Sequence, residues 1–177
     1  FFIEKFLSKQ ELGLYSFSLK LFTISLAGLT PMLTVLRIKQ IDVAKNKNIK
    51  EYVHRNFKKV FLCAVCFYFI AIIGTCILTI FFFKNYIGSL WASIILISTS
   101  FVSYLSIPFN FLMADRKYNI VLRLSLISLF LTLLINLLFI QTYKLIAAAM
   151  SVFVAQSFLN FGSALYSYYI FVKRENK

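Results

Sequence analysis

The chain has 177 residues, of which 60% are hydrophobic, 18% aromatic and only 14% charged, and its mean hydropathy is +0.83. A soluble domain of this size could not hide that much apolar surface from water, so the composition indicates an integral membrane protein. The net charge of +13 would suit a nucleic-acid-binding protein, but most basic residues lie in short segments between apolar runs, where membrane topology and anionic lipid explain them. We therefore expect a lipid bilayer as a partner and no nucleic acid.

The first predicted membrane-spanning helix covers residues 12–36. It is long enough to cross a bilayer, which takes roughly 20 mostly apolar residues, yet it contains Lys20. A charge at membrane depth costs about 2.5–3.5 kcal/mol on insertion scales and usually faces a bundle interior or a wet cavity. Small and polar residues recur around it at steps of three and four, which keeps them on one helical face. This polar stripe of the first span consists of Ser16, Lys20, Thr23, Ala27, Thr30 and Thr34.

Four further apolar runs follow, and they predict spanning helices at 60–83, 89–113, 120–140 and 145–172. The runs are much longer than the roughly ten residues of a membrane β-strand and do not alternate. The predicted fold is therefore all-α, with five transmembrane helices. The opening residues FFIEKF have no cationic signal-peptide start. We expect residues 1–11 to be an outer-face segment with the end of a preceding helix, so that the chain starts within a larger protein.

The basic residues predict the orientation of these helices. Fourteen of the nineteen lysines and arginines lie in the segment 37–59, in the connection 114–123 and in the tail 173–177. Alternation through five spans brings these three segments to one side, which the positive-inside rule assigns to the cytoplasm. The N-terminal segment is then outside and the C-terminus is cytoplasmic. Apolar residues share one helical face within 37–59, which predicts a basic cytoplasmic loop containing an interfacial helix.

Polar side chains also share one face in each of three later spans. They are Thr99, Ser103, Ser106 and Asn110; Ser125, Ser128, Thr132 and Asn136; and Gln156, Asn160, Ser163 and Ser167. Such residues ordinarily hold membrane helices together by close packing and hydrogen bonds, and we favour that interpretation for any single stripe. Four stripes, one of them with a lysine, favour a bundle around a mildly polar cavity. No Asp, Glu or His lies deep in a span, which argues against a proton relay.

Catalytic and metal-binding patterns are missing from the sequence. Cys63 and Cys66 form a CxxC, but no second pair or nearby histidine accompanies them, and we interpret them as small apolar side chains. His54, the one histidine, is interpreted as a solvated loop residue. The acidic residues lie in loops or at span edges, and no phosphate-binding loop or Ser-His-Asp set is present. We expect no enzymatic activity, no cofactor and no metal.

Two stretches carry motifs that match a known family. The first, FLSKQELGLYSFSLKLFTISLAGLTPMLTVL, contains an E-x-G-x-Y-S pattern, then a basic residue and a proline. These residues are Glu11, Gly13, Tyr15, Ser16, Lys20 and Pro31. The second runs from Asn136 through Tyr143 to Ala148 and Ala149, and is similar to N-x-x-L … Y-G-x-x-G-A-A. It departs from that pattern at Phe139, Lys144 and Ala147. Together they resemble the C-terminal half of Wzx-type polysaccharide flippases, in the multidrug/oligosaccharidyl-lipid/polysaccharide exporter superfamily.

The resemblance implies a two-lobe, twelve-helix transporter of which the five spans form part of the C-terminal lobe, with the N-terminal lobe as a missing partner. It also implies translocation of undecaprenyl-pyrophosphate-linked oligosaccharides across the bacterial inner membrane by alternating access, for O-antigen (lipopolysaccharide) or capsule biosynthesis, beside other polysaccharide-assembly proteins. Because this substrate is anionic, Lys20 would be the cation of the substrate cavity. Weaker candidates for its polar lining are Thr23, Asn110, Asn136, Gln156 and Asn160.

Two alternatives stay open. One is a drug or small-molecule exporter of the same superfamily, which would normally need ionisable groups for ion coupling. The other is a non-transport membrane assembly or anchoring protein, in which the polar stripes serve packing alone and the basic loop recruits a cytoplasmic partner.

Overall fold

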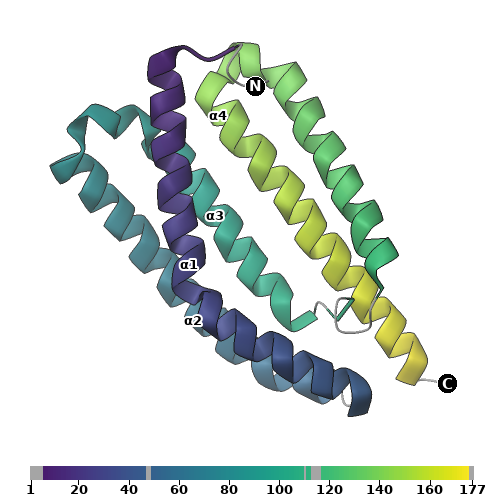
Figure 1. Ribbon diagram of the computed structural model, residues 1–177. Coiled ribbons are helices and arrows are strands. Elements are labelled where there is room, and N and C mark those ends of the chain that lie inside the picture. The colour runs from purple at the N-terminus through teal and green to yellow at the C-terminus, as the bar shows by residue number, and fades with distance from the viewer. Residues whose placement is uncertain (1–5, 47–48, 110, 113–116, 176–177) are drawn as a thin grey trace.

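The computed structural model describes residues 6–46, 49–109, 111–112 and 117–175, and this part of the chain is almost wholly helical, without a strand (Figure 1). The all-α prediction is therefore confirmed for these residues. Short π-helical and 3₁₀ turns connect α2 to α3, and another 3₁₀ turn follows α3. The elements are α1 Lys9–Asn46, α2 Ile49–Ile77, η2 Leu78–Phe82, η3 Lys84–Ser89, α3 Leu90–Ser106, η4 Ile107–Phe109 and α4 Tyr118–Glu175.

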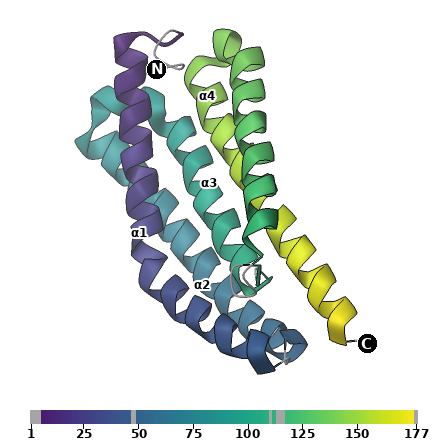
Figure 2. The same ribbon diagram turned by 45° about the vertical axis from the view of Figure 1, so that its right-hand side comes forward.

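Helix α4 is a hairpin of two arms, because its backbone leaves the helical conformation at Lys144 (φ 45°, ψ −114°). Figures 1 and 2 show the arms running side by side in opposite directions. We call residues 118–143 the N-arm and 145–175 the C-arm. The described chain thus forms five helical rods, and the break in α4 lies between the apolar runs at 120–140 and 145–172.

Within the part of the chain that the structure describes, three helical segments are long and apolar enough to cross a membrane: Glu51–Phe82, Lys84–Ser106 and Tyr118–Ile170. The last of these includes both arms of α4. Helix α1 is not among them and is the least apolar of the four helices. It includes charged and polar residues at both ends, and Lys20 with a series of serines and threonines interrupts the leucines between them. Helices of spanning length thus match the membrane-like composition, while the number of five spans stays a prediction.

The predicted basic loop at 37–59 is helical wherever it is described. Helix α1 continues to Asn46, and α2 begins at Ile49.

Helix α1 bends between its two ends (Figure 1) and contains Pro31, whose ring removes one backbone hydrogen bond. Gly28 lies one turn earlier against Phe67, where a Cβ atom would be 2.7 Å from the ring Cζ. A glycine at this position therefore allows α1 and α2 to approach closely.

Helix α3 is the centre of the bundle, since it packs against α1, α2 and α4. Its buried face carries hydroxyl groups as well as apolar side chains. Ser93 Oγ donates a hydrogen bond to Ser18 Oγ of α1 (3.0 Å), and Tyr104 Oη donates to the Ser25 carbonyl oxygen of α1 (3.0 Å). Tyr68 Oη of α2 lies 2.9 Å from Ser98 Oγ. Side-chain hydrogen bonds therefore join α3 to α1 and to α2, as is typical of membrane bundles.

The backbone at Lys144 leads to a first prediction. Its positive φ suits glycine and strains other residues by about 1–3 kcal/mol. Lys144→Gly and Lys144→Ala both remove the lysine side chain, but only alanine keeps a Cβ. Glycine relieves the backbone strain, but it also makes the unfolded chain more flexible, which offsets part of this gain. We therefore expect the glycine variant to be about 1 kcal/mol more stable than the alanine variant. Thermal unfolding in detergent measures the difference, and an alanine variant of equal or higher stability would contradict it.

Candidate functional site

All six residues of the polar stripe on α1 are exposed. They are Ser16, Lys20, Thr23, Ala27, Thr30 and Thr34. The buried face of the same helix carries other polar residues, among them Ser18 (0% exposed) and Ser25 (7%), whose atoms bond to α3 and the turn before it. The sequence thus correctly predicted a shared face, and that face is turned away from the rest of the described chain.

Within the stripe, the threonine hydroxyls bond to their own helix. Thr23 Oγ1 donates to the Leu19 carbonyl oxygen at 2.8 Å, and Thr30 and Thr34 make the same contact with the carbonyl four residues earlier, at 3.0 and 3.1 Å. The Lys20 ammonium is different, because it makes no hydrogen bond or ion pair with any described residue. The Ser16 hydroxyl also makes no hydrogen bond with a described residue. Lys20 is therefore the charged member of the stripe, and its partner must come from outside the described residues.

Asn136 and Asn160 bond across helix interfaces. Asn136 is 3% exposed, and its Nδ2 donates to Ser151 Oγ (2.9 Å), which links the N-arm of α4 to the C-arm. Asn160 Nδ2 donates to Ser103 Oγ (2.9 Å), which links the C-arm to α3. Both amide groups thus contribute to helix packing. The Oδ1 atom of Asn136 is buried and has no hydrogen-bond partner among the described residues.

The remaining candidates are not brought together. Gln156 is exposed on the C-arm, and Asn110 lies outside the described residues. No hydrogen bond joins any two of the five candidates that the structure does describe. Most of the other residues in the three later stripes are buried between helices, among them Thr99, Ser106, Ser128, Ser163 and Ser167. Packing therefore accounts for much of these three stripes, and the α1 stripe alone is exposed throughout.

Glu11 joins the start of α1 to the hairpin of α4, a contact that the sequence analysis missed. The Ser8 N–H donates to Glu11 Oε2 (2.8 Å) and the Glu11 N–H donates to Ser8 Oγ (3.3 Å), which is a capping box. The other carboxylate oxygen, Oε1, pairs with Lys144 Nζ at 2.8 Å. The hydrogen bond from Lys144, followed by that from the Ser8 backbone, lowers the pKa of Glu11 below its ordinary value of 4.5, against a small opposing effect of desolvation.

This ion pair brings together the two stretches that carry the family-like motifs. Beside it, Leu145 and Ala149 of the C-arm form a buried cluster with Ala92 and Leu96 of α3. Partly buried residues of α1 pack against this cluster: Leu14, Tyr15, Leu19 and Phe22. Lys144 stands where the second motif has a glycine, and no local pattern in the sequence pairs its charge with Glu11, 133 positions earlier.

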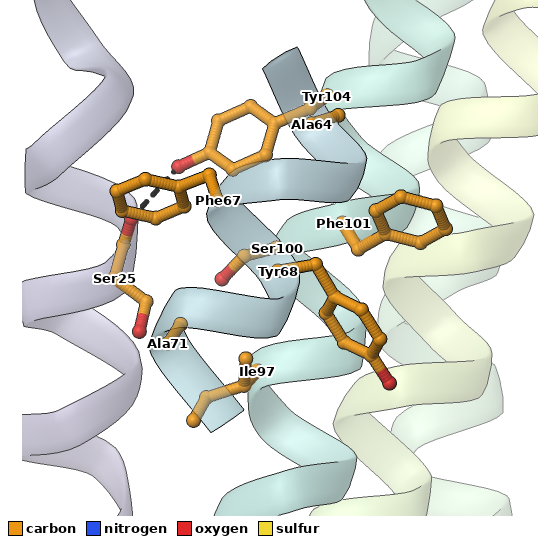
Figure 3. Close-up of a pocket in the computed structure, with 9 residues that line it drawn as sticks. All are labelled: Ser25, Ala64, Phe67, Tyr68, Ala71, Ile97, Ser100, Phe101 and Tyr104. Carbon is orange, nitrogen blue, oxygen red and sulfur yellow. Dashed lines mark hydrogen bonds between the residues drawn. The ribbon is translucent and has the colours of Figure 1, made fainter. Parts of the chain in front are cut away.

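Pockets lie between the described helices, and the five described candidates line none of the three considered next. The first is a narrow gap between α1, α2 and α3, where Ser100 Oγ is buried and has no hydrogen-bond partner among the described residues (Figure 3). It has no room for a water molecule. The second, of about 400 Å³, lies between the end of α1 and the start of α2 and contains both acidic and basic residues. The third is an apolar groove of about 900 Å³ between α2, α3 and the C-arm.

Comparison with protein-family models, with curated proteins and with solved structures finds no match for this chain. The resemblance to Wzx-type flippases therefore rests on the residues of the two motifs, their order and their spacing.

A second prediction tests whether Asn136 serves helix packing or lines a cavity. If the bond between Asn136 and Ser151 holds the two arms together, the variants Asn136→Ala, Ser151→Ala and the double variant should show a coupling energy of about 0.6 kcal/mol, the average for such bonds in a membrane protein. Thermal unfolding in detergent measures it. Gln156→Ala is the matched control on an exposed face and should leave stability within about 0.5 kcal/mol. Additive effects of the two substitutions would contradict a packing role for Asn136.

A third prediction follows from the lowered pKa of Glu11. A carboxyl group whose pKa is lower in the folded than in the unfolded chain stabilises the fold above its unfolded pKa, and this stabilisation disappears as the pH falls through the folded pKa. The wild type should therefore be more stable than Glu11→Gln at pH 7, and the difference should shrink below about pH 4.5 and vanish at lower pH. Thermal unfolding at a series of pH values tests this. A difference that does not change with pH would exclude the Glu11 charge as its cause.

Proposed function

We propose that the chain forms part of the C-terminal lobe of a Wzx-type flippase in the bacterial inner membrane. The complete transporter would move undecaprenyl-pyrophosphate-linked oligosaccharide units across the membrane by alternating access, for O-antigen or capsule biosynthesis. The chain would contribute five spans, from an outer N-terminal segment to a cytoplasmic C-terminus. The proposed role is transport without a catalytic step.

The observation that carries the proposal is the exposed stripe on α1 with Lys20 within it. Facing lipid, a lysine at this depth would cost about 2.5–3.5 kcal/mol on insertion scales. Facing a polar cavity between two lobes, it would have water and an anionic substrate as partners. At an effective dielectric constant of 20, two unit charges 4 Å apart attract each other by about 4 kcal/mol. The diphosphate of a lipid-linked oligosaccharide is a partner of suitable charge.

The contact between Glu11 and Lys144 supports a rigid lobe. Alternating access in transporters of this kind is largely a rigid-body movement of one half against the other. Helix α1 is connected to the α4 hairpin by this ion pair and to α3 by the serine and tyrosine bonds. The surface that bears the stripe would therefore move as one body with α3 and α4.

A fourth prediction tests Lys20 in the intact transporter. Lys20→Ala should reduce the surface polysaccharide at least about tenfold at unchanged protein level, which corresponds to a loss of about 1.4 kcal/mol. Lys20→Arg keeps the charge and should retain most export. Lys9→Ala, an exposed lysine at the outer end of α1, is the control and should export normally.

The same experiment separates the alternatives. Full export by Lys20→Ala would remove Lys20 from the mechanism and favour packing or anchoring as the role of this chain. Normal polysaccharide combined with a loss of resistance to small toxic compounds would favour a drug exporter of the same superfamily.

A further inference from the structure

A deep apolar groove lies between α2, α3 and the C-arm of α4. Its volume is about 900 Å³, within the roughly 300–1,000 Å³ typical of sites for small molecules. We call it the α2–α4 groove. It is lined by Val53, His54, Phe57, Lys58, Leu105, Ser106, Phe109, Phe161, Ala164, Leu165 and Tyr168.

The walls of the groove are almost entirely apolar, and several side chains that line it are exposed. Leu165 is 70% exposed, Phe161 47% and Tyr168 44%. No other part of the described chain covers these surfaces. The α2 wall lies at the basic start of the segment Glu51–Phe82, and the C-arm wall lies within the segment Tyr118–Ile170; both segments are long and apolar enough to cross a membrane. The groove therefore combines apolar walls with the basic start of a helix, which suits the boundary between hydrocarbon and lipid headgroups.

Lys58 is the charged residue of the groove lining, and it is exposed on α2. His54, also exposed, lies one turn earlier on the same helix, and none of the lining residues is acidic. The neighbouring pocket between α1 and α2 differs in this respect, because Asp42 and Glu51 line it beside its basic residues. An occupant of the α2–α4 groove should accordingly combine an apolar body with an anionic end.

The groove is preformed, because direct contacts hold its walls together. The Phe111 N–H donates to Ser167 Oγ (2.7 Å), which fixes the C-arm to the segment after α3. The rings of Phe57 and Phe109 are in contact, with centroids 5.4 Å apart, which fixes α2 to the same segment. A ligand would therefore enter a shaped site without first ordering it, and this lowers the cost of binding.

We propose that the α2–α4 groove binds an anionic phospholipid of the cytoplasmic leaflet. An acyl chain lies along Phe161, Leu165 and Tyr168, and the headgroup phosphate interacts with Lys58 and His54. The positive-inside pattern of the sequence puts this end of the bundle at the leaflet where anionic lipids attract basic residues. The inference requires that the chain lies in a bilayer with its basic segments on the cytoplasmic side, and it does not depend on which cargo, if any, is transported.

Tryptophan fluorescence tests the proposal directly, because Trp91 is the one tryptophan of the chain. Trp91→Phe combined with Tyr168→Trp places a single reporter in the groove. The protein is reconstituted in phosphatidylcholine vesicles that contain a small fraction of phosphatidylglycerol or phosphatidylcholine with dibrominated acyl chains, which quench tryptophan on contact. We expect stronger quenching by brominated phosphatidylglycerol than by brominated phosphatidylcholine at equal mole fraction. A reporter at Phe161→Trp should give the same preference and serves if the first variant does not fold.

The role of the charge is tested in the same background. Lys58→Ala should weaken the preference for phosphatidylglycerol about fivefold, the factor that corresponds to about 1 kcal/mol for one lysine near an anionic surface. Lys84→Ala removes an exposed lysine between α2 and α3, at the other end of α2, and should leave the preference unchanged.

Three results would overturn the proposal. Equal quenching by the two brominated lipids would mean ordinary contact with the bilayer. A preference that survives Lys58→Ala would separate the lipid from the basic end of the groove. A reporter shielded from both lipids would mean that another protein surface, from a second copy or a different chain, covers the groove.

Discussion

Polar groups in a membrane helix must find partners within the protein, because hydrocarbon offers none. This constraint organises the bundle. Hydroxyl and amide groups on the inner faces of α1, α2 and α4 bond to α3 or to one another, as with Ser18 and Ser93, Tyr104 and the Ser25 carbonyl, and Asn160 and Ser103. Such bonds are individually weak, on average about 0.6 kcal/mol in a membrane protein. Because these bonds are distributed along α3, together they favour the burial of particular faces of the other helices.

The same constraint distinguishes the exposed stripe of α1 from the other polar stripes. Most polar residues of the three later stripes are buried in interfaces, and the threonines of α1 bond to their own backbone. Lys20 has neither kind of partner among the described residues. A helix face of this composition is more costly against lipid than against water or a second polar surface. The stripe is therefore the face of α1 on which the proposed polar cavity rests.

Lys144 combines two opposing effects at one position. A non-glycine residue with φ 45° is strained, yet its side chain reaches Glu11 and so connects the α4 hairpin to the capped start of α1. An ion pair with one partner 56% exposed contributes little free energy on its own. Its effect is on geometry, because it holds the start of α1 against the hairpin turn of α4. The adjacent cluster of leucines and alanines provides the apolar part of this contact.

The sequence by itself determined the fold class, the long apolar helices and the shared face of the α1 stripe, because composition and periodicity are local properties that helix geometry converts directly into faces. The sequence also indicated a break between the two apolar runs of α4, but not that the break lies at Lys144. Only the tertiary structure decided which polar faces are interfaces and which is open, since a serine that bonds a neighbouring helix and a serine that lines a cavity have the same local signature. Asn136 and Asn160 were weaker candidates for the same cavity as Lys20, and the structure shows both bonding across helix interfaces, whereas Lys20 is exposed. The pairing of Glu11 with Lys144 and the walls of the α2–α4 groove likewise depend on residues far apart in the chain, which only the packing of the helices brings together.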